Sequence, residues 1–316
     1  MKTKILPFLL CFSVIIALII YPDKYLIVVF NGIKLFAVNV LPALLPFFFF
    51  TGLLSNLGAG EIFAKAFNRP CRSLYNTSGI GGYVYITSML SGYPVGAKVI
   101  SDLVKDQKIS PKDASVIMTY TSTSGPLFIV GTVGSIMLNN KLAGMILLVC
   151  HYLSALINGL IYRNKTNTSS LTLLSPKSVD NVLSESIYSA VTSVSIAGAY
   201  VAIFYTVGAI LTDIGVIPLI ANLLSTVVEY DVANGIAFGL IEMTGGCLML
   251  SKSCSIYSIP AICAIISFGG LSVTLQSMTF LEKAKVKPTK YLLSKITQSI
   301  IAFFVCLLVI KFIYPL

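Results

Sequence analysis

The sequence predicts an all-α polytopic membrane protein with about seven transmembrane spans and two re-entrant helical hairpins, arranged as an inverted repeat. Three observations predict this class: a very apolar composition, several hydrophobic runs of spanning length, and two apolar segments with a glycine-rich break in the middle. Of 316 residues, 56% are hydrophobic and only 22 Lys+Arg and 12 Asp+Glu are present. The mean hydropathy is +0.90. A soluble domain, of which about a quarter is charged, is therefore excluded.

The composition also argues against several functional classes. The net charge of +10 comes from short loops, where an excess of Lys and Arg indicates cytoplasmic placement rather than nucleic-acid binding. Seven cysteines without a Cys-x-x-Cys pair and a single histidine, His151, predict no metal site. We interpret His151 as a core residue with a hydrogen-bond partner. No ATP-binding, serine-hydrolase or zinc-protease motif is present, so we expect neither an enzyme nor a bound cofactor.

The first predicted element is a span at residues 5–21, which follows Lys2 and Lys4 and forms an N-terminal transmembrane helix within residues 1–24. Its basic start places the N-terminus in the cytoplasm. Residues 25–40 are expected to lie in the outer membrane interface without crossing. The other predicted spans, each long enough for about 30 Å of hydrocarbon, are 41–57, 112–138, 141–162, 193–211, 256–281 and 291–314.

Two apolar segments, 79–104 and 232–251, are interrupted in their middle. The first break is Ser91-Gly92-Tyr93-Pro94 and the second is Thr244-Gly245-Gly246. A half-helix of about 12 residues rises about 18 Å, which reaches the middle of a bilayer but does not cross it. Backbone exposed at such a tip is tolerated where it lies in protein or lines a wet cavity. We therefore predict two re-entrant hairpins.

Loop charges set the predicted orientation. The loops at 61–75, 163–177 and 283–290 are basic, whereas residues 212–231 contain three acids and no base. The positive-inside rule makes the first three loops cytoplasmic and the last external. Seven spans and two hairpins, with the N-terminus inside and the C-terminus outside, place every one of these loops on the expected side.

The chain also resembles itself at an offset of about 150 residues. The matched pairs are 47–58 with 204–215, 88–92 with 241–245, and 123–127 with 267–271. Because the loops after the first matched helix have opposite charge, the halves are expected to point in opposite directions, as in many secondary transporters. The predicted divisions are a first repeat at 25–162, a cytoplasmic linker at 163–178 and a second, inverted repeat at 179–316. The alternative is two unrelated bundles with accidental breaks.

Four breaks should converge in this arrangement, at 91–94, 121–126, 244–246 and 267–272. A half-helix that begins at a break presents unpaired N–H groups, which suit an anion. The hydroxyl run from Thr121 to Ser124 supplies further donors and acceptors. The predicted substrate-binding residues are Ser91, Gly92, Tyr93, Lys98, Thr121, Ser122, Thr123, Ser124, Gly125, Thr244, Gly245, Ser267, Gly269, Gly270, Ser272 and Gln276.

Glu242 is the most informative single residue, because an acid deep in a membrane segment is costly and should be paired, protonated or ion-bound. We predict that Glu242 contacts substrate or binds a coupling H⁺ or Na⁺. The alternative is a structural ion pair with Lys98. Lys98 either faces an anionic substrate or extends toward the inner surface beside Asp102 and Lys105.

At the breaks, the sequence resembles the sporulation integral membrane proteins of the YlbJ/SpoVV type, within the nucleoside-recognition or "Gate" group. The most specific string is Ser-Gly-Tyr-Pro-Val-Gly-Ala-Lys at 91–98, and further resembling strings lie at 41–48, 123–128, 239–245 and 267–273. The resemblance covers most of the chain. It implies a fold similar to the cores of concentrative nucleoside transporters, with hairpin tips forming the site.

For the sporulation branch, the resemblance implies export of dipicolinate from the mother cell toward the forespore. Dipicolinate is a small planar dianion, which agrees with helix N-termini and hydroxyls. Thr121 and Thr274 stand where more strongly polar residues are expected, and the chain is shorter than the usual members, so a divergent paralogue with another substrate is a further alternative. A nucleoside is less well matched, because near the breaks only Tyr93, Phe268 and Gln276 suit base recognition.

We therefore expect a secondary transporter or facilitator of a small organic anion in a bacterial cytoplasmic membrane or a mother-cell or forespore membrane, working by alternating access. Its partners are the lipid bilayer and the anion, with no nucleic acid, and an oligomer is possible. A nucleoside-type transporter and a non-transporting membrane component of spore-envelope assembly are the alternatives.

Overall fold

The computed structural model describes residues 2–165 and 181–313, and all regular secondary structure in these residues is helical. The all-α prediction is therefore confirmed. The elements are α1 (Lys2–Ile20), α2 (Pro22–Leu35), η1 (Phe36–Val40), α3 (Leu41–Asn56), α4 (Ala59–Ala66), α5 (Asn68–Tyr75), α6 (Ile80–Ser91), α7 (Val95–Lys105), α8 (Pro111–Thr121), η2 (Leu127–Met137), α9 (Lys141–Ile161), α10 (Val182–Asp213), α11 (Val216–Leu224), α12 (Tyr230–Gly239), α13 (Met243–Leu250), α14 (Ser258–Phe268), α15 (Gly270–Leu281) and α16 (Pro288–Ile313).

Five helices in the described residues are long and apolar enough to cross a membrane: Pro22–Asn56, Lys141–Ile161, Val182–Asp213, Ser258–Leu281 and Pro288–Phe312. They correspond to five of the seven predicted spans. The other two predicted spans coincide with α1 and with the shorter pair α8 and η2, so the total of seven stays a prediction. Most of the predicted linker at 163–178 lies outside the described residues.

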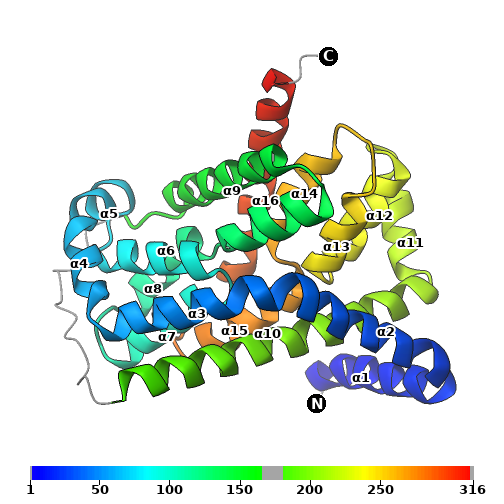
Figure 1. Ribbon diagram of the computed structural model, residues 1–316, viewed down its shortest axis with the longest axis horizontal. Helices are drawn as coiled ribbons and strands as arrows, with labels where there is room; N and C mark the ends of the chain where they lie inside the picture. The colour runs from blue at the N-terminus through cyan, green and yellow to red at the C-terminus, as the bar shows by residue number, and fades with distance from the viewer. Residues whose placement is uncertain (1, 166–180, 314–316) are drawn as a thin grey trace.

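We expected residues 25–40 to lie in the outer interface without crossing. In the structure α2, η1 and α3 form one continuous helix, Pro22–Asn56, so these residues lead directly into the following span (Figure 1). A helix of 35 residues is about 52 Å long, well over the hydrocarbon thickness of about 30 Å. The whole segment is therefore longer than an upright span requires, and either tilts strongly or extends beyond the hydrocarbon.

Continuity through this region depends on the π-helical segment η1. Proline at position 42 cannot donate the usual backbone hydrogen bond and clashes with the carbonyl four residues earlier. The wider turn of η1, in which the Leu41 N–H donates to the Phe36 carbonyl, accommodates the disruption without ending the helix. The carbonyl of Asn39 in the same segment accepts a hydrogen bond from the Thr132 hydroxyl at 2.6 Å, which ties it to η2.

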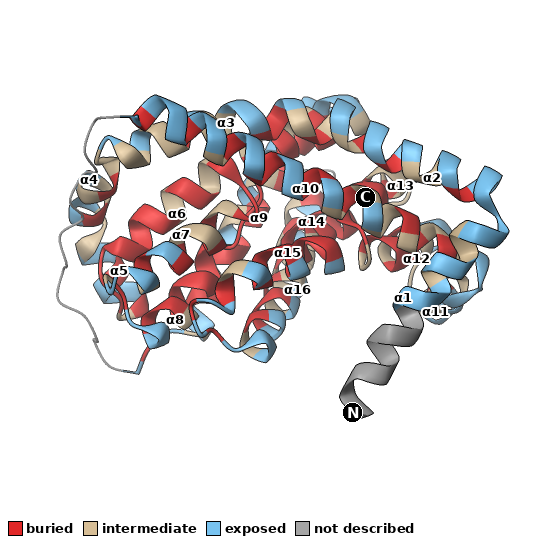
Figure 2. Cartoon of the chain, turned by 90° about the horizontal axis from the view of Figure 1, so that it is seen from below, coloured by how far each residue is buried: buried red, intermediate tan, exposed pale blue. Residues whose placement is uncertain are grey.

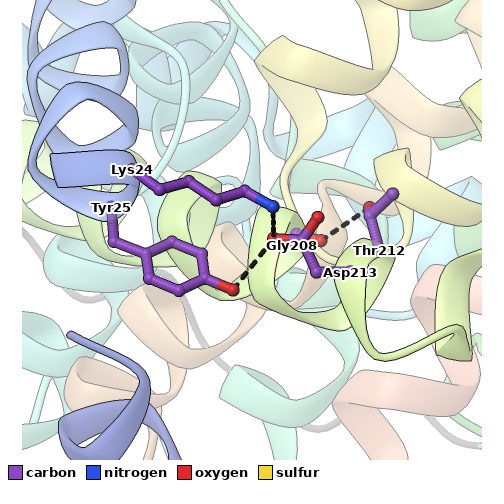
Figure 3. A network of polar contacts seen from close by, with 5 residues as sticks. All are labelled: Lys24, Tyr25, Gly208, Thr212 and Asp213. Carbon is purple, nitrogen blue, oxygen red and sulfur yellow. Dashed lines mark hydrogen bonds and ion pairs between the residues drawn. The ribbon is translucent and has the colours of Figure 1, made fainter. Parts of the chain in front are cut away.

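The long helix Pro22–Asn56 packs antiparallel against α10, as Figure 1 shows along the lower side of the molecule. At one end, Asp213 forms an ion pair with Lys24 at 2.7 Å and accepts a hydrogen bond from the Tyr25 hydroxyl at 2.9 Å (Figure 3). At the other end, Asn56 donates to the Ser186 hydroxyl at 3.2 Å. The pairing thus extends over nearly the full length of both helices.

Both segments predicted to be hairpins fold as helix–turn–helix units. The first consists of α6 and α7 around residues 92–94, as predicted. The second consists of α12 and α13, but its turn lies at residues 240–242 and not at Thr244-Gly245-Gly246, which begin α13. The glycine pair serves packing instead of chain reversal, because a Cβ at Gly246 would lie 2.3 Å from the Gly239 Cα on the facing helix.

The outside of the molecule is rich in exposed large apolar side chains, including Phe312, Val227, Ile19 and Leu308, each more than 65% exposed. Figure 2 shows exposed residues along the outward sides of α2, α3 and α10, while α6 and α14 are largely buried. A surface of this kind suits hydrocarbon as solvent, because a soluble protein rarely exposes such extensive apolar area. The fold is that of a multi-pass integral membrane protein.

Candidate functional site

The first hairpin tip contacts the first broken helix directly. The Gly92 backbone has φ +80°, and a Cβ at Gly92 would lie 2.6 Å from the Gly125 nitrogen. Such an approach requires glycine at position 92, on both steric and conformational grounds. The predicted breaks at 91–94 and 121–126 therefore lie side by side.

The second tip meets the second broken helix in a similar way. Leu271 and Ser272, in the first turn of α15, donate their N–H groups to the carbonyls of Leu240 and Ile241 at 2.8 and 3.1 Å. Gly269 and Gly270 separate α14 from α15 with φ of +88° and +67°. The N–H groups expected to be available for an anion at this helix start are thus occupied by carbonyls of the hairpin tip.

Two side chains connect the pairs of breaks to each other. The Tyr93 hydroxyl, from the first tip, donates to the Ile266 and Ser267 carbonyls at 3.2 and 3.4 Å. His151 on α9 accepts the Ser124 N–H on Nε2 at 3.0 Å, and its Nδ1 lies 2.8 Å from the Ser267 hydroxyl. Because Nε2 is an acceptor, the ring proton is assigned to Nδ1. All four breaks therefore converge in one region.

Glu242 lies at the centre of this region and is 1% exposed. It is the residue before α13, and its carboxylate oxygens accept the N–H groups of Thr244 and Gly245 at 3.0 and 2.6 Å. Carboxylates at a helix start are stabilised by these unpaired donors and by the helix dipole. The anion that the sequence predicted at this helix start is, in this conformation, the protein's own carboxylate.

The alternative of an ion pair between Glu242 and Lys98 is wrong for this conformation. Lys98 donates to the Ser189 hydroxyl on α10 and lines two larger cavities farther along α7. It does not contribute to the cavity that contains Glu242. The neighbouring Asp102 also lines both of those cavities, as expected if Lys98 extends toward the protein surface.

A small cavity of about 40 Å³ lies where the breaks meet. Six predicted site residues line it, together with Val40, Leu44, Phe128, Ala197, Tyr200, Val201, Met243 and Val273; the six are Tyr93, Ser124, Glu242, Thr244, Ser272 and Gln276. This volume suffices for about three water molecules, whereas pockets for organic ligands measure about 300–1,000 Å³. In this structure the cavity is therefore too small for an organic ligand.

Helix α15 brings unusually many polar atoms without partners to this region. Among the described residues, Ser272 Oγ, Thr274 Oγ1, Gln276 Nε2 and Ser277 Oγ are buried and have no hydrogen-bond partner. Buried polar groups are nearly always paired, and each unpaired group costs about 1–3 kcal/mol. Ser272 and Gln276 line the cavity, so these donors are available to a polar ligand there.

The other predicted site residues do not line this cavity. The Ser91 and Thr51 hydroxyls are 2.6 Å apart. Thr121 bonds back to the Ile117 carbonyl of its own helix. The Ser122 hydroxyl lies 2.9 Å from the Tyr291 hydroxyl and the Thr123 hydroxyl donates to Ser88 Oγ at 3.4 Å. The hydroxyl run therefore mainly joins helices, and of its four members only Ser124 lines the cavity.

The sequence analysis missed Lys295, which lies on α16 and is 1% exposed. Its ammonium group donates to the Tyr93 hydroxyl at 2.7 Å and to the Ser122 carbonyl and Gln298 Oε1 at 2.9 Å each. A lysine near the start of a predicted span is compatible with a position at the membrane surface, and nothing in the local sequence distinguishes that from burial.

A larger open cavity of about 860 Å³ lies on the side of the first hairpin away from the tips. The charged residues that line it are Lys98, Lys105, Lys108, Lys283, Lys285, Asp102 and Asp113. Five bases against two acids make it a basic vestibule. A further polar cavity of about 160 Å³ between α3, α7 and α10 shares Lys98 and Asp102 with this vestibule.

Comparison with known proteins supports the resemblance carried by the break motifs. The chain is similar to the sporulation integral membrane protein YlbJ of Bacillus subtilis (strain 168), with 23% identity over 90% of this chain and 77% of that protein. No protein-family model and no solved structure matches the chain.

Proposed function

We propose that this chain, which is similar to a sporulation integral membrane protein, is a secondary carrier of a small organic anion, with dipicolinate as the first candidate. The observation that supports this most is the small cavity at the junction of four chain breaks, with a buried carboxylate and unpaired donors on its wall. Carriers bind their substrates at such broken segments near the middle of the membrane. A component without a transport role requires no such junction.

The arrangement around Glu242 suggests how a proton is coupled to the anion. In this structure, its carboxylate occupies the N–H groups of Thr244 and Gly245. If Glu242 takes up a proton, it becomes a weaker acceptor and releases these donors. A substrate carboxylate then takes its place at the start of α13. One proton thus accompanies one bound carboxylate, and the net charge of the helix start is unchanged.

The small cavity requires movement before a substrate can enter. The hairpin tips must separate from the broken helices, which breaks the contacts of Gly92 with Gly125 and of Leu271 with Leu240. The polar cavity between α3, α7 and α10 and the basic vestibule offer a route for an anion to the first hairpin. Separation of the contacts on one side at a time gives alternating access.

Uptake of labelled dipicolinate into vesicles containing the purified protein tests the proposal. We expect the wild-type protein to accumulate the anion faster when the entry side is acidic, because Glu242 must be protonated. In Glu242→Gln the neutral amide mimics the protonated acid, so uptake should lose its pH dependence and its accumulation against a gradient.

The matched control is Glu229→Gln in the loop before α12. Glu229 is exposed, and the Ser255 hydroxyl, which donates to it at 2.7 Å, lowers the pKa of its carboxyl. This control removes an ionised carboxylate outside the site and should transport as the wild type does. Transport of a labelled nucleoside but not of dipicolinate would favour the nucleoside-type alternative. No uptake of either, in protein that remains folded, would contradict the carrier proposal.

A further inference from the structure

Lys295 is a buried lysine for which no described acid is an ion-pair partner. Its three N–H donors are all used, and each acceptor is a neutral oxygen: the Tyr93 hydroxyl, the Ser122 carbonyl and the Gln298 amide oxygen. The ion pairs found among the described residues join Lys24 with Asp213 and Lys65 with Glu61. Burying an ammonium group without a counter-charge is costly, so its position requires a reason other than stability.

The oxygens around Lys295 come from different parts of the chain. Tyr93 is at the first hairpin tip, Ser122 is in the first broken helix, and Gln298 lies one turn beyond Lys295 on α16. Hydroxyl, carbonyl and amide oxygens are the ligands that hard cations prefer in proteins. An ammonium nitrogen 2.7–2.9 Å from three such oxygens occupies a position that otherwise suits a monovalent metal cation.

We propose that Lys295 is a tethered cation that takes the place of a coupling Na⁺ at the first hairpin tip and supplies the positive charge that favours an anionic substrate. This inference rests on the proposed carrier function and adds the basis of its charge selectivity. It leaves the coupling role to the proton on Glu242. A carrier with a fixed cation at this position needs no Na⁺ to complete its site.

Lys295 acts on the cavity through Tyr93 and is a positioning residue in this sense. The Tyr93 side chain lines the cavity, and the Lys295 nitrogen lies 4.7 Å from the centre of its ring as well as 2.7 Å from its hydroxyl. The ammonium group fixes the ring and keeps the Tyr93 hydroxyl proton directed away from itself, toward the Ile266 and Ser267 carbonyls. The positive charge of Lys295 acts on a ligand in the cavity, because charges in the protein interior are poorly screened.

Thermal unfolding of the purified full chain in detergent tests the inference without any substrate. Lys295→Ala leaves room and three oxygens for a cation from solution. We expect this variant to be less stable than the wild type in N-methylglucamine chloride, whose cation is too large to enter. Sodium or ethylammonium chloride at equal ionic strength should raise its midpoint by about 3 °C or more. The wild type should unfold at the same temperature in all three salts.

Lys98→Ala is the matched control, because Lys98 is half-buried and, like Lys295, bonded to a hydroxyl, but lies away from the tips. It should show no cation-specific stabilisation. The inference is overturned by a Lys295→Ala variant that is indifferent to the cation or by a wild type that Na⁺ stabilises. Failure to recover folded Lys295→Ala and Lys295→Ser from membranes prepared in Na⁺ overturns it as well. Absence of dipicolinate uptake would contradict the carrier proposal alone, since this assay measures cation binding.

Discussion

At the scale of single residues, the sequence identified the acid but not its partners. Glu242 is recognisable because it is an acid in a long apolar segment, and its burial agrees with that expectation. Its position before α13 could not be read from the sequence, because the adjacent glycine pair was interpreted as the break. Lys295 was missed for a different reason: whether a lysine near a helix start is buried depends on which helices pack around it.

The unpaired amide of Gln276 predicts opposite effects on stability and transport. Gln276 Nε2 is buried without a partner, so replacement by methionine removes a desolvated polar group and should raise the free energy of unfolding by about 1 kcal/mol. The same change removes a donor from the cavity wall and should reduce dipicolinate uptake several-fold. Thermal unfolding and vesicle uptake on the same preparation measure both effects.

The matched control for this prediction is Thr206→Val, because the Thr206 hydroxyl donates to the Ala202 carbonyl of its own helix at 2.9 Å. Thr206→Val should change neither the free energy of unfolding nor dipicolinate uptake by much. A Gln276→Met protein that is both less stable and fully active would show that the amide has a structural role and no part in binding.

At the scale of elements, sequence patterns located the helices better than the contacts between them. The first hairpin was predicted correctly because Gly92 and Pro94 mark its turn. In the second hairpin the glycines at 245 and 246 mark close packing, and the turn at 240–242 contains no glycine. Glycine in an apolar segment has two meanings, chain reversal and close helix contact, and distinguishing them requires the partner helix. The long helix Pro22–Asn56 was divided for another reason, because a further crossing before residue 41 would have placed the charged loops on the wrong sides of the membrane.

Gly246 provides a test of how tightly the second hairpin is packed. A Cβ at this position would lie 2.3 Å from the Gly239 Cα and 2.8 Å from the Gly239 nitrogen, both backbone atoms that a side-chain rotation cannot move. Gly246→Ala should therefore destabilise the protein by about 1–3 kcal/mol despite the better helix propensity of alanine.

Gly52→Ala is the matched substitution in another helix, where the new Cβ would meet only the Ser186 Cβ at 3.9 Å. It should be neutral or slightly stabilising. The measurement is the thermal unfolding midpoint of both variants against the wild type. Equal stability of the two variants would show that α12 and α13 are not held in this close contact.

At the scale of the whole molecule, the element order of the two halves corresponds closely. After α1, the first half has a long helix, two short helices, a hairpin, a broken helix and a final long helix: Pro22–Asn56, α4 and α5, α6–α7, α8–η2 and α9. The second half has the same order with one short helix: α10, α11, α12–α13, α14–α15 and α16. The two leading helices pack antiparallel. The junction at the tips depends on long-range contacts that no local sequence pattern encodes.

The opposite orientation of the two halves in the membrane remains to be tested, and two exposed positions make the test direct. Ser73 on α5 belongs to the basic loop predicted to be cytoplasmic, and Cys254, an exposed native thiol, follows the second hairpin on the side predicted to be external. In a Cys11→Ser background, Cys254 should react with a membrane-impermeant maleimide added to intact cells. Ser73→Cys, combined with Cys254→Ser, should react only after the membrane is made permeable. Because both side chains are exposed in the folded protein, a difference in labelling reports the side of the membrane and not burial. Labelling of both positions from the same side would mean that the second half is not inverted. The two hairpins could then not enter the membrane from opposite faces, and a single site between them could not open to each face in turn.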